Sequence, residues 1–269
     1  MNSIITFTSD FGTQGHYTGE VKGAMLSVNP EAKIVDITHQ VGAHNLLEAS
    51  YVIAQSYRAF APRTVHLVVV DPGVGSGRRS IIIEADHHFF VAPDNGVLSL
   101  VYRQAELQRV VSIEAEHYFR RPVSPTFHAR DIFAPVAAHL STGASVLSFG
   151  REITDFTRLA LPVDREVQPG VWEGFILHID RFGNIITSLR PETIRASCGN
   201  NFKVLGMEIQ GCAIKRHVDH YAAGGEEEIF SLLSSGGFYE VAALKKSAAA
   251  QLGARRGMKV ELKVGKAGT

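Results

Sequence analysis

Short apolar runs recur through the first half of the chain and predict buried strands. Their apolar residues follow one another without polar alternation, which is typical of strands that are covered on both faces of a sheet. The runs occupy residues 4–8, 33–38, 65–70, 80–85 and 89–93.

Helical patterns separate the first of these strands. Residues 16–30 and 45–60 carry apolar side chains near helical spacing, and the patterns stop at Pro30 and Pro62. A further helix is expected over 130–143. Strands that alternate with helices predict an α/β N-terminal domain with a central, largely parallel sheet flanked by helices.

The pattern changes at residues 161–170, a stretch rich in proline and charge that predicts a linker. Downstream, short strands are separated by Gly, Asn and Ser turns, and one helix is expected over 247–257. We therefore expect an N-terminal domain over 1–160 and a smaller all-β domain, barrel-like or sandwich-like, over 171–269. The strands expected there are 174–180, 184–189, 202–214, 228–235, 238–244 and 259–264.

Composition and charge narrow the possible functions. The 269 residues are 45% hydrophobic, which is enough for two domain cores. Lys+Arg and Asp+Glu both number 27, so no overall field favours nucleic acid or an anionic membrane, and neither is expected as a partner. There are two cysteines, Cys198 and Cys212, and neither a signal peptide nor a membrane-length apolar run is found, so we expect a cytoplasmic protein.

Two aspartates follow predicted strands, where α/β sheets usually bind ligands. Asp10 lies in "TSDFG", and Asp71 opens "DPGVGSGRR". One such aspartate is commonly a turn or helix-capping residue, but two on one sheet favour a ligand site. Arg78 or Arg79 can fold back across the glycine-rich turn to pair with Asp71, and the spacing alone does not choose between them. The chosen arginine would orient the carboxylate and keep it ionised.

Histidines offer further candidate chemistry. His128 in "TFHARDIFAP" precedes a predicted helix, with Asp131 as a capping acid. It is equally a general base poised near neutral pH or a satisfied buried histidine. The adjacent His87 and His88 would point to opposite faces of a strand, so no metal site is expected there.

Two turns in the second half present polar groups. "HIDRFGN" brings Asp180, Phe182 and Asn184 together, either as plain turn chemistry or as a carboxylate and an amide beside an aromatic ring for a polar small molecule. Ser235 lies in a glycine-rich turn that is either an ordinary hairpin or a ligand contact.

Taken together, these motifs resemble one family, the S-adenosylmethionine hydroxide adenosyltransferases, which are hydrolytic relatives of the fluorinating and chlorinating adenosyl enzymes. The similarity covers nearly the whole chain, and the DPGVGxxRR and FHxRDIF blocks are its most specific parts. The motifs, in chain order, are "TSDFG", "IVDITH", "DPGVGSGRR", "VAPDNG", "TFHARDIFAP", "IDRFGN" and "SSGGFYEVA".

The resemblance implies that water or hydroxide attacks the ribose C5′ of S-adenosylmethionine in line and releases adenosine and L-methionine, with no cofactor or metal. It implies a catalytic set of Asp71, Arg78 and His128. It also implies a homotrimer with sites between the N-terminal domain of one subunit and the C-terminal domain of the next. The substrate-binding residues that it implies are Asp10 for the ribose, Asp180 and Asn184 for methionine, Phe182 beside them, Tyr221 and Ser235.

The chain also departs from its relatives. Asp71 stands where the halogenating enzymes carry a tyrosine, and the long insertion after their following strand is missing, so no halogenase activity is expected. Leu244 stands where the family often has asparagine, which affects one backbone or adenine contact.

Two other classes of function remain open. A metal-dependent hydrolase of a nucleoside-type substrate would use Asp10, Asp71, His128 and Asp131, and would lose activity in chelator. A non-catalytic protein would bind S-adenosylmethionine or adenosine without turnover. The Asp71, Arg78 and His128 set argues against that second class, because binding a sulfonium needs no base.

Overall fold

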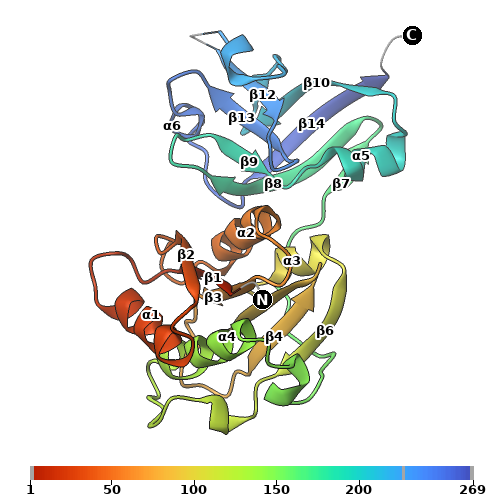
Figure 1. Ribbon diagram of the computed structural model, residues 1–269. Helices are drawn as coiled ribbons and strands as arrows, with labels where there is room; N and C mark the ends of the chain where they lie inside the picture. The colour runs from red at the N-terminus through yellow and green to blue at the C-terminus, as the bar shows by residue number, and fades with distance from the viewer. Residues whose placement is uncertain (1–2, 226–227, 267–269) are drawn as a thin grey trace. The chain divides into compact units, whose positions relative to one another are not determined.

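The computed structural model describes residues 3–225 and 228–266, and the chain divides into two compact units, Met1–Leu159 and Ala160–Thr269 (Figure 1). Part of the predicted linker 161–170 is a strand, β7 (Arg165–Gln168), which pairs with β8 (Val171–Ile179). All four β7 side chains are exposed, so no alternating apolar pattern marks this strand in the sequence. Within the described residues, no helix has the length and apolar character that crossing a membrane requires.

The N-terminal unit is built on a six-stranded sheet with the order β2-β1-β3-β5-β4-β6. The first four strands in this order run parallel, whereas β4 is antiparallel to both β5 and β6. The expected largely parallel sheet is therefore wrong for one edge, and the sheet is mixed. The strands are β1 (Ile4–Ser9), β2 (Lys33–Thr38), β3 (Val65–Val69), β4 (Ser80–Ala85), β5 (His88–Pro93) and β6 (Leu107–Ser112).

A two-residue turn explains the antiparallel edge. Asp86 and His87 connect β4 directly to β5, with positive φ angles of 47° and 63°. Such a left-handed pair forms a tight hairpin, which joins only antiparallel strands, because a parallel pair needs a much longer crossover.

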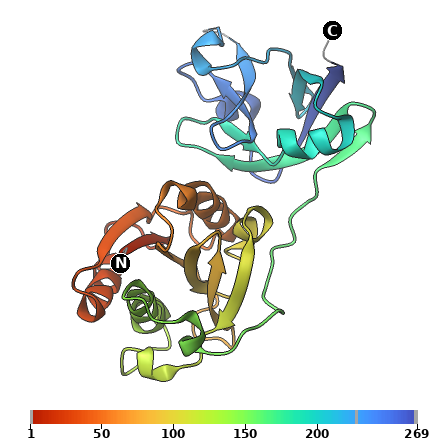
Figure 2. The ribbon, with the colours of Figure 1, turned by 45° about the vertical axis from the view of Figure 1, so that its right-hand side comes forward.

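Helices cover both faces of this sheet (Figures 1 and 2). Helix α4 (Ala134–Ser141) packs on β1 and β3, and α1 (Tyr17–Val28) packs against α4; both helices share one apolar core with those strands. Helices α2 (Leu46–Ser56) and α3 (Ser99–Gln104) pack together on the opposite face. Asn45 caps α2 by accepting a hydrogen bond from the amide of Glu48 at 3.1 Å. Helix α3 and strand β6 were not expected from the sequence.

The helix expected over 130–143 has an unusual beginning. Residues Ala129–Phe133 form a π-helical turn, and α4 follows it directly with Pro135 in its first turn. Short π-helical turns are rare and occur frequently at functional sites. His128 immediately precedes this one.

The C-terminal unit is an eight-stranded sheet of antiparallel pairs, ordered β11-β10-β14-β8-β9-β13-β12, with β7 added on β8. Its end strands β11 and β12 lie close together, so the sheet curls into a near-barrel. The predicted β-rich second half is confirmed. Its remaining elements are β9 (Ile185–Thr187), α5 (Pro191–Cys198), β10 (Phe202–Ile209), β11 (Cys212–Ile214), β12 (Ile229–Leu233), β13 (Tyr239–Ala243), α6 (Ala248–Leu252) and β14 (Lys259–Lys266).

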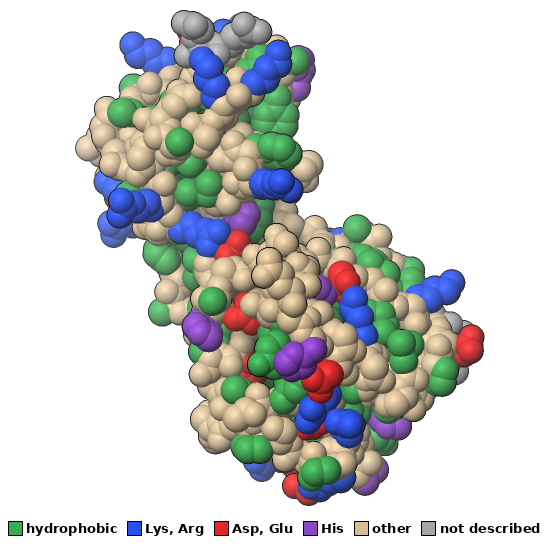
Figure 3. All heavy atoms as spheres, turned by 90° about the vertical axis from the view of Figure 1, so that its left-hand side faces the viewer, with side chains coloured by type: hydrophobic (Ala, Val, Ile, Leu, Met, Phe, Trp, Pro, Cys, Tyr) green, Lys and Arg blue, Asp and Glu red, His purple; other side chains and the backbone are tan. Residues whose placement is uncertain are grey.

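Charge is mixed on the part of the surface drawn in Figure 3. On the N-terminal unit, acidic and basic side chains lie next to one another on this face. One such contact in that unit is the ion pair of Lys22 and Asp36, at 2.6 Å. This agrees with the even overall count of acidic and basic residues.

Candidate active site

Two carboxylates meet at one edge of the N-terminal sheet. Asp10 directly follows β1 and Asp71 follows β3, and these strands are parallel neighbours, so both side chains emerge at the same end. Both line a cavity of about 320 Å³ that His128 also lines. We call it the N-terminal cavity.

Asp71, Arg78 and His128 form one hydrogen-bonded chain. The Arg78 Nε lies 2.8 and 2.9 Å from the two Asp71 carboxylate oxygens, and Nη2 donates to the same carboxylate. Nη2 also lies 3.0 Å from the His128 Nδ1. The side chains of Arg78 and Asp71 are 9% and 5% exposed, so this fork-shaped ion pair is shielded from water, unlike a surface salt bridge.

The hydrogen bond from Arg78 decides which tautomer of His128 is present. A guanidinium has no acceptor, so the Nδ1 that contacts Arg78 must accept the hydrogen bond and carry no proton. The proton of the neutral ring then sits on Nε2. Burial, followed by the Arg78 charge, lowers the pKa of His128, which favours this neutral form. In this state the ring offers a donor, and not a base, at Nε2.

A glycine allows the segments that carry Arg78 and His128 to pack closely together. Gly75 has a φ of 80°, and a Cβ there would lie 2.5 Å from the Pro125 carbonyl oxygen. The loop that carries Arg78 therefore packs backbone to backbone against the segment before His128. The space that a side chain at position 75 would fill is thus occupied by the Pro125 backbone.

The second arginine of the pair points elsewhere. Arg79 donates to Asp94 at 2.9 Å and to the Asp155 carboxylate at 2.8 Å. The ambiguity left by the spacing is thus resolved, since Arg78 alone pairs with Asp71. Arg79 instead ties the start of β4 to the end of β5 and to the segment around Asp155, which follows α4 in the sequence.

Asp131 is not a helix cap. Its side chain is fully buried and accepts hydrogen bonds from the Ser124 amide at 2.9 Å and from Arg130 Nε at 2.7 Å, while Arg120 lies at 3.3 Å. These contacts fasten the segment before His128 to the π-helical turn. The same arginines hold the pKa of Asp131 below its usual range despite burial.

Asp10 is held from one side. Its Oδ2 accepts the His44 amide hydrogen at 2.9 Å, and its side chain is 11% exposed. The turn after it is closed by a hydrogen bond from the Gly12 amide to the His39 carbonyl at 2.7 Å. A carboxylate fixed in this way retains acceptor positions for a diol.

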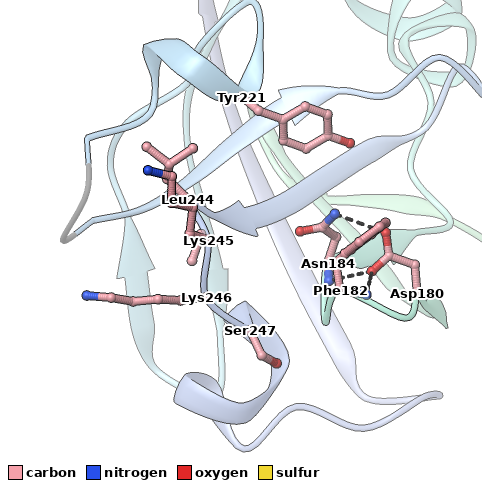
Figure 4. Close-up of a pocket in the computed structure, with 9 residues that line it drawn as sticks. Asp180, Phe182, Asn184, Tyr221, Leu244, Lys245, Lys246 and Ser247 are labelled. Atoms are coloured by element: carbon pink, nitrogen blue, oxygen red, sulfur yellow. Dashed lines mark hydrogen bonds between the residues drawn. The ribbon is translucent and has the colours of Figure 1, made fainter.

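A second cavity, of about 550 Å³, lies in the C-terminal unit and is lined by Asp180, Phe182, Asn184 and Tyr221 (Figure 4). We call it the C-terminal cavity. The Asp180 carboxylate accepts from the Phe182 and Asn184 amides and from the Asn184 side chain, each at 2.9 Å. A Cβ on Gly183 would lie 2.0 Å from the Ser247 hydroxyl oxygen, so only glycine fits this turn. Asp180 therefore builds the turn and presents Asn184 at the same time.

The other binding residues expected in the second half of the sequence do not all line the C-terminal cavity. Tyr221 donates to Glu240 at 2.7 Å, and burial raises the pKa of this carboxyl. Leu244 also lines the C-terminal cavity (Figure 4). Ser235 instead sits exposed in the turn between β12 and β13 and does not line this cavity.

Sequence reasoning missed several residues that line or support the cavities. Phe11, Tyr17 and Phe127 line the N-terminal cavity, and Glu240 supports Tyr221. Phe11 and Phe127 are neighbours of Asp10 and His128, so their position next to the motifs was an available signal. Tyr17 lies seven residues beyond Asp10 at the start of α1, and only the fold brings it back.

The arrangement of possible metal-ligand side chains bears on the metal-dependent hydrolase, one of the two alternatives left open by the sequence. Within residues 3–225 and 228–266, no three His, Cys, Asp or Glu side chains gather in a way that could hold a metal ion. The Asp131 carboxylate, one of the four ligands in the metal alternative, is instead engaged by arginines and a backbone amide.

Comparisons with known proteins agree on one family. The models for the SAM hydroxide adenosyltransferase N-terminal and C-terminal domains match residues 5–150 and 174–261. A protein of Methanocaldococcus jannaschii named (R)-S-adenosyl-L-methionine hydrolase is 36% identical over 196 residues, covering 71% of this chain and 68% of its own. One of the same name from Thermus thermophilus is 32% identical and covers 96% and 98%. A crystal structure of an uncharacterized conserved protein from Thermotoga maritima superposes with a TM-score of 0.89 at 32% identity, covering 96% and 99%.

Proposed function

The chain belongs to the SAM hydroxide adenosyltransferase family, and we propose that it hydrolyses S-adenosyl-L-methionine to adenosine and L-methionine. One observation in the structure supports this most directly: the partly buried contact of Asp71, Arg78 and His128 at the edge of the N-terminal cavity. It offers a polar, partly desolvated place for a nucleophilic oxygen beside an acceptor for a ribose.

In the proposed reaction, the oxygen of a water or hydroxide attacks C5′ opposite the sulfur. The new C5′–O bond forms as the C5′–S bond breaks, and the bonding pair moves to sulfur, which leaves as the neutral thioether of methionine. The water proton goes to solvent. Because the attack of an anionic oxygen on a sulfonium neutralises charge, a site of low dielectric favours the transition state.

We assign His128 the role of donor to the nucleophile. Its Nε2 proton would hold the oxygen and stabilise hydroxide, while Arg78 fixes the tautomer and Asp71 fixes Arg78. Asp10 would accept hydrogen bonds from the ribose hydroxyls, and this places C5′ near the nucleophile. Asp180 and Asn184 would bind the amino acid part of the substrate. Phe182, Tyr221 and Ser235 complete the proposed set of binding residues.

The proposed assembly is a homotrimer with sites shared between subunits. The residues assigned to one substrate are divided between two cavities, one in each unit of the chain. We also propose that the reaction needs no metal or cofactor, that no halide is used, and that the protein is cytoplasmic. Both cysteines are free, in keeping with a reducing compartment.

The test is to incubate the purified protein with S-adenosyl-L-methionine in oxygen-18 water, with chelator and without halide. Adenosine that carries oxygen-18 at the 5′-hydroxyl, together with methionine, is the expected result. Loss of turnover in chelator would favour a metal-dependent hydrolase instead. Binding without turnover would favour a sensor.

A further inference from the structure

We propose that the ring of Tyr17 recognises the positive charge of the substrate sulfonium and makes the N-terminal cavity selective for sulfonium over neutral thioether. This inference rests on the proposed function and extends it to a residue outside the proposed catalytic and binding set. Tyr17 begins helix α1 and lines the cavity that also contains Asp10, Asp71 and His128.

In-line displacement fixes where the sulfur must lie. The attacking oxygen approaches C5′ to about 3–3.5 Å in a reactive complex, and the sulfur is bonded to the far side of the same carbon. The sulfur is therefore within about 5 Å of the oxygen held at His128. That distance keeps the sulfonium near the walls of the N-terminal cavity.

Three aromatic side chains form one part of those walls. The ring of Phe127 lies 5.3 Å from Tyr17 and 6.1 Å from Phe11, and Tyr17 and Phe11 are 6.0 Å apart. The ring planes of Tyr17 and Phe127 stand at 86°. This edge-to-face packing holds the three rings in place without a substrate.

Tyr17 is the most accessible ring of the three. The Arg130 guanidinium covers Phe127 at 5.0 Å from the ring centroid, and Phe11 is half-buried against the core. His16 packs beside Tyr17 at 4.4 Å, yet Tyr17 remains 48% exposed. An aromatic surface at the cavity wall is thus available to a ligand.

The chemistry of a sulfonium makes such a ring useful. A trialkylsulfonium has no N–H or O–H and cannot donate a conventional hydrogen bond, so charge and aromatic surface are what can recognise it. Hydrolysis converts it into a neutral thioether, and the attraction to the ring then disappears. The same contact that selects the substrate therefore weakens as the product forms, which favours release.

This mechanism makes an unusual kinetic prediction. An attraction that is present in the bound substrate and fades toward the transition state lowers KM and does not raise kcat. Replacing Tyr17 with leucine should raise KM for S-adenosyl-L-methionine about tenfold, the size of an aromatic-cation contact, while kcat stays the same or increases. Loss of packing alone would instead lower kcat.

The test uses the full chain and two ligands. Calorimetry in a His128→Ala background, which suppresses turnover, measures Kd for S-adenosyl-L-methionine and for S-adenosyl-L-homocysteine, its neutral thioether. Tyr17→Leu should weaken the first ligand about tenfold and the second less than about twofold, and Tyr17→Phe should change neither. Steady-state kinetics in the wild-type background supply the KM and kcat values.

Equal weakening of both ligands, or no weakening of the sulfonium, would overturn the role of Tyr17. A failure of the proposed function gives a different result. The wild-type protein would then release no adenosine, while the ratio of the two dissociation constants could still be measured.

Discussion

Lowering the pH from 7 to 5 should destabilise the N-terminal unit through one buried histidine. His66 lies in β3, the strand that leads to Asp71, and its side chain is fully buried. Its Nδ1 contacts the Thr6 hydroxyl at 2.7 Å, and its Nε2 lies 3.2 Å from the His88 Nδ1. Burial, with a smaller effect of His88, lowers the pKa of His66 from 6.5 to about 3.

The sign and size follow from proton binding. Between pH 6.5 and about 3, the unfolded chain binds a proton at this position and the folded protein does not. Protons therefore favour the unfolded state in that window, and stability that is complete above pH 6.5 is lost as the pH falls. Each pH unit inside the window costs about 1.4 kcal/mol, so the change from pH 7 to pH 5 costs about 2 kcal/mol.

Native-state hydrogen exchange of peptides from β3 measures the relevant free energy without assuming that both units unfold together. The variant His66→Gln keeps a polar side chain but cannot titrate, so its opening free energy should depend less steeply on pH, by about 1.4 kcal/mol per unit between pH 6 and pH 4. His87→Asn removes an exposed histidine from the adjacent hairpin turn and serves as the control. Parallel pH curves for wild type and His66→Gln would refute the reasoning.

Three further predictions concern the candidate site. His128→Gln should retain at least about tenfold more activity than His128→Ala in the adenosine assay, because glutamine can donate a hydrogen bond but cannot take a proton; equal losses would argue for a base. Gly75→Ala should lower the unfolding free energy by more than about 1 kcal/mol in thermal melts. The added Cβ would meet the Pro125 carbonyl at 2.5 Å, and the φ of 80° is strained for alanine. An unchanged melting temperature would contradict this contact. If sites are shared between subunits, co-expressing His128→Ala with Asn184→Ala chains should restore about a quarter of the wild-type sites. In those restored sites, one subunit supplies an intact N-terminal unit and the next subunit supplies an intact C-terminal unit. Activity no greater than that of either variant alone would place each site in one chain.

How far the sequence predicts the site depends on the kind of contact. Strand ends and a fixed seven-residue spacing were enough to expect a pair between Asp71 and an arginine. They could not choose between Arg78 and Arg79. Neighbouring residues at the start of a strand point to opposite sides of the sheet, and the conformation of the preceding turn decides which of the two arginines faces Asp71. That turn depends on Gly75 packing against Pro125, a contact between segments about fifty residues apart.

The same limit applies to the fold. Apolar runs identified β1 to β5, but the direction of β4 depended on whether Asp86 and His87 adopt left-handed backbone, which neither residue requires. Helix α3 and strand β6 carry weaker patterns and escaped detection. Strand β7, within the expected linker, also escaped detection, since its side chains are exposed and carry no apolar pattern while its backbone pairs with β8.

The number of hydrogen-bond donors on Arg78 decides whether it can hold the nucleophilic oxygen directly or acts through His128. A guanidinium has five N–H donors. Nε donates to the Asp71 carboxylate, Nη2 donates to Asp71 and His128, and Nη1 lies 3.2 Å from the Ser80 hydroxyl and 3.4 Å from the Arg79 carbonyl. Every donor thus has an acceptor within the protein, so Arg78 cannot hold the nucleophile without breaking a contact. Its charge acts at a distance and its geometry acts through His128, whose Nε2 proton is the donor left for the nucleophilic oxygen.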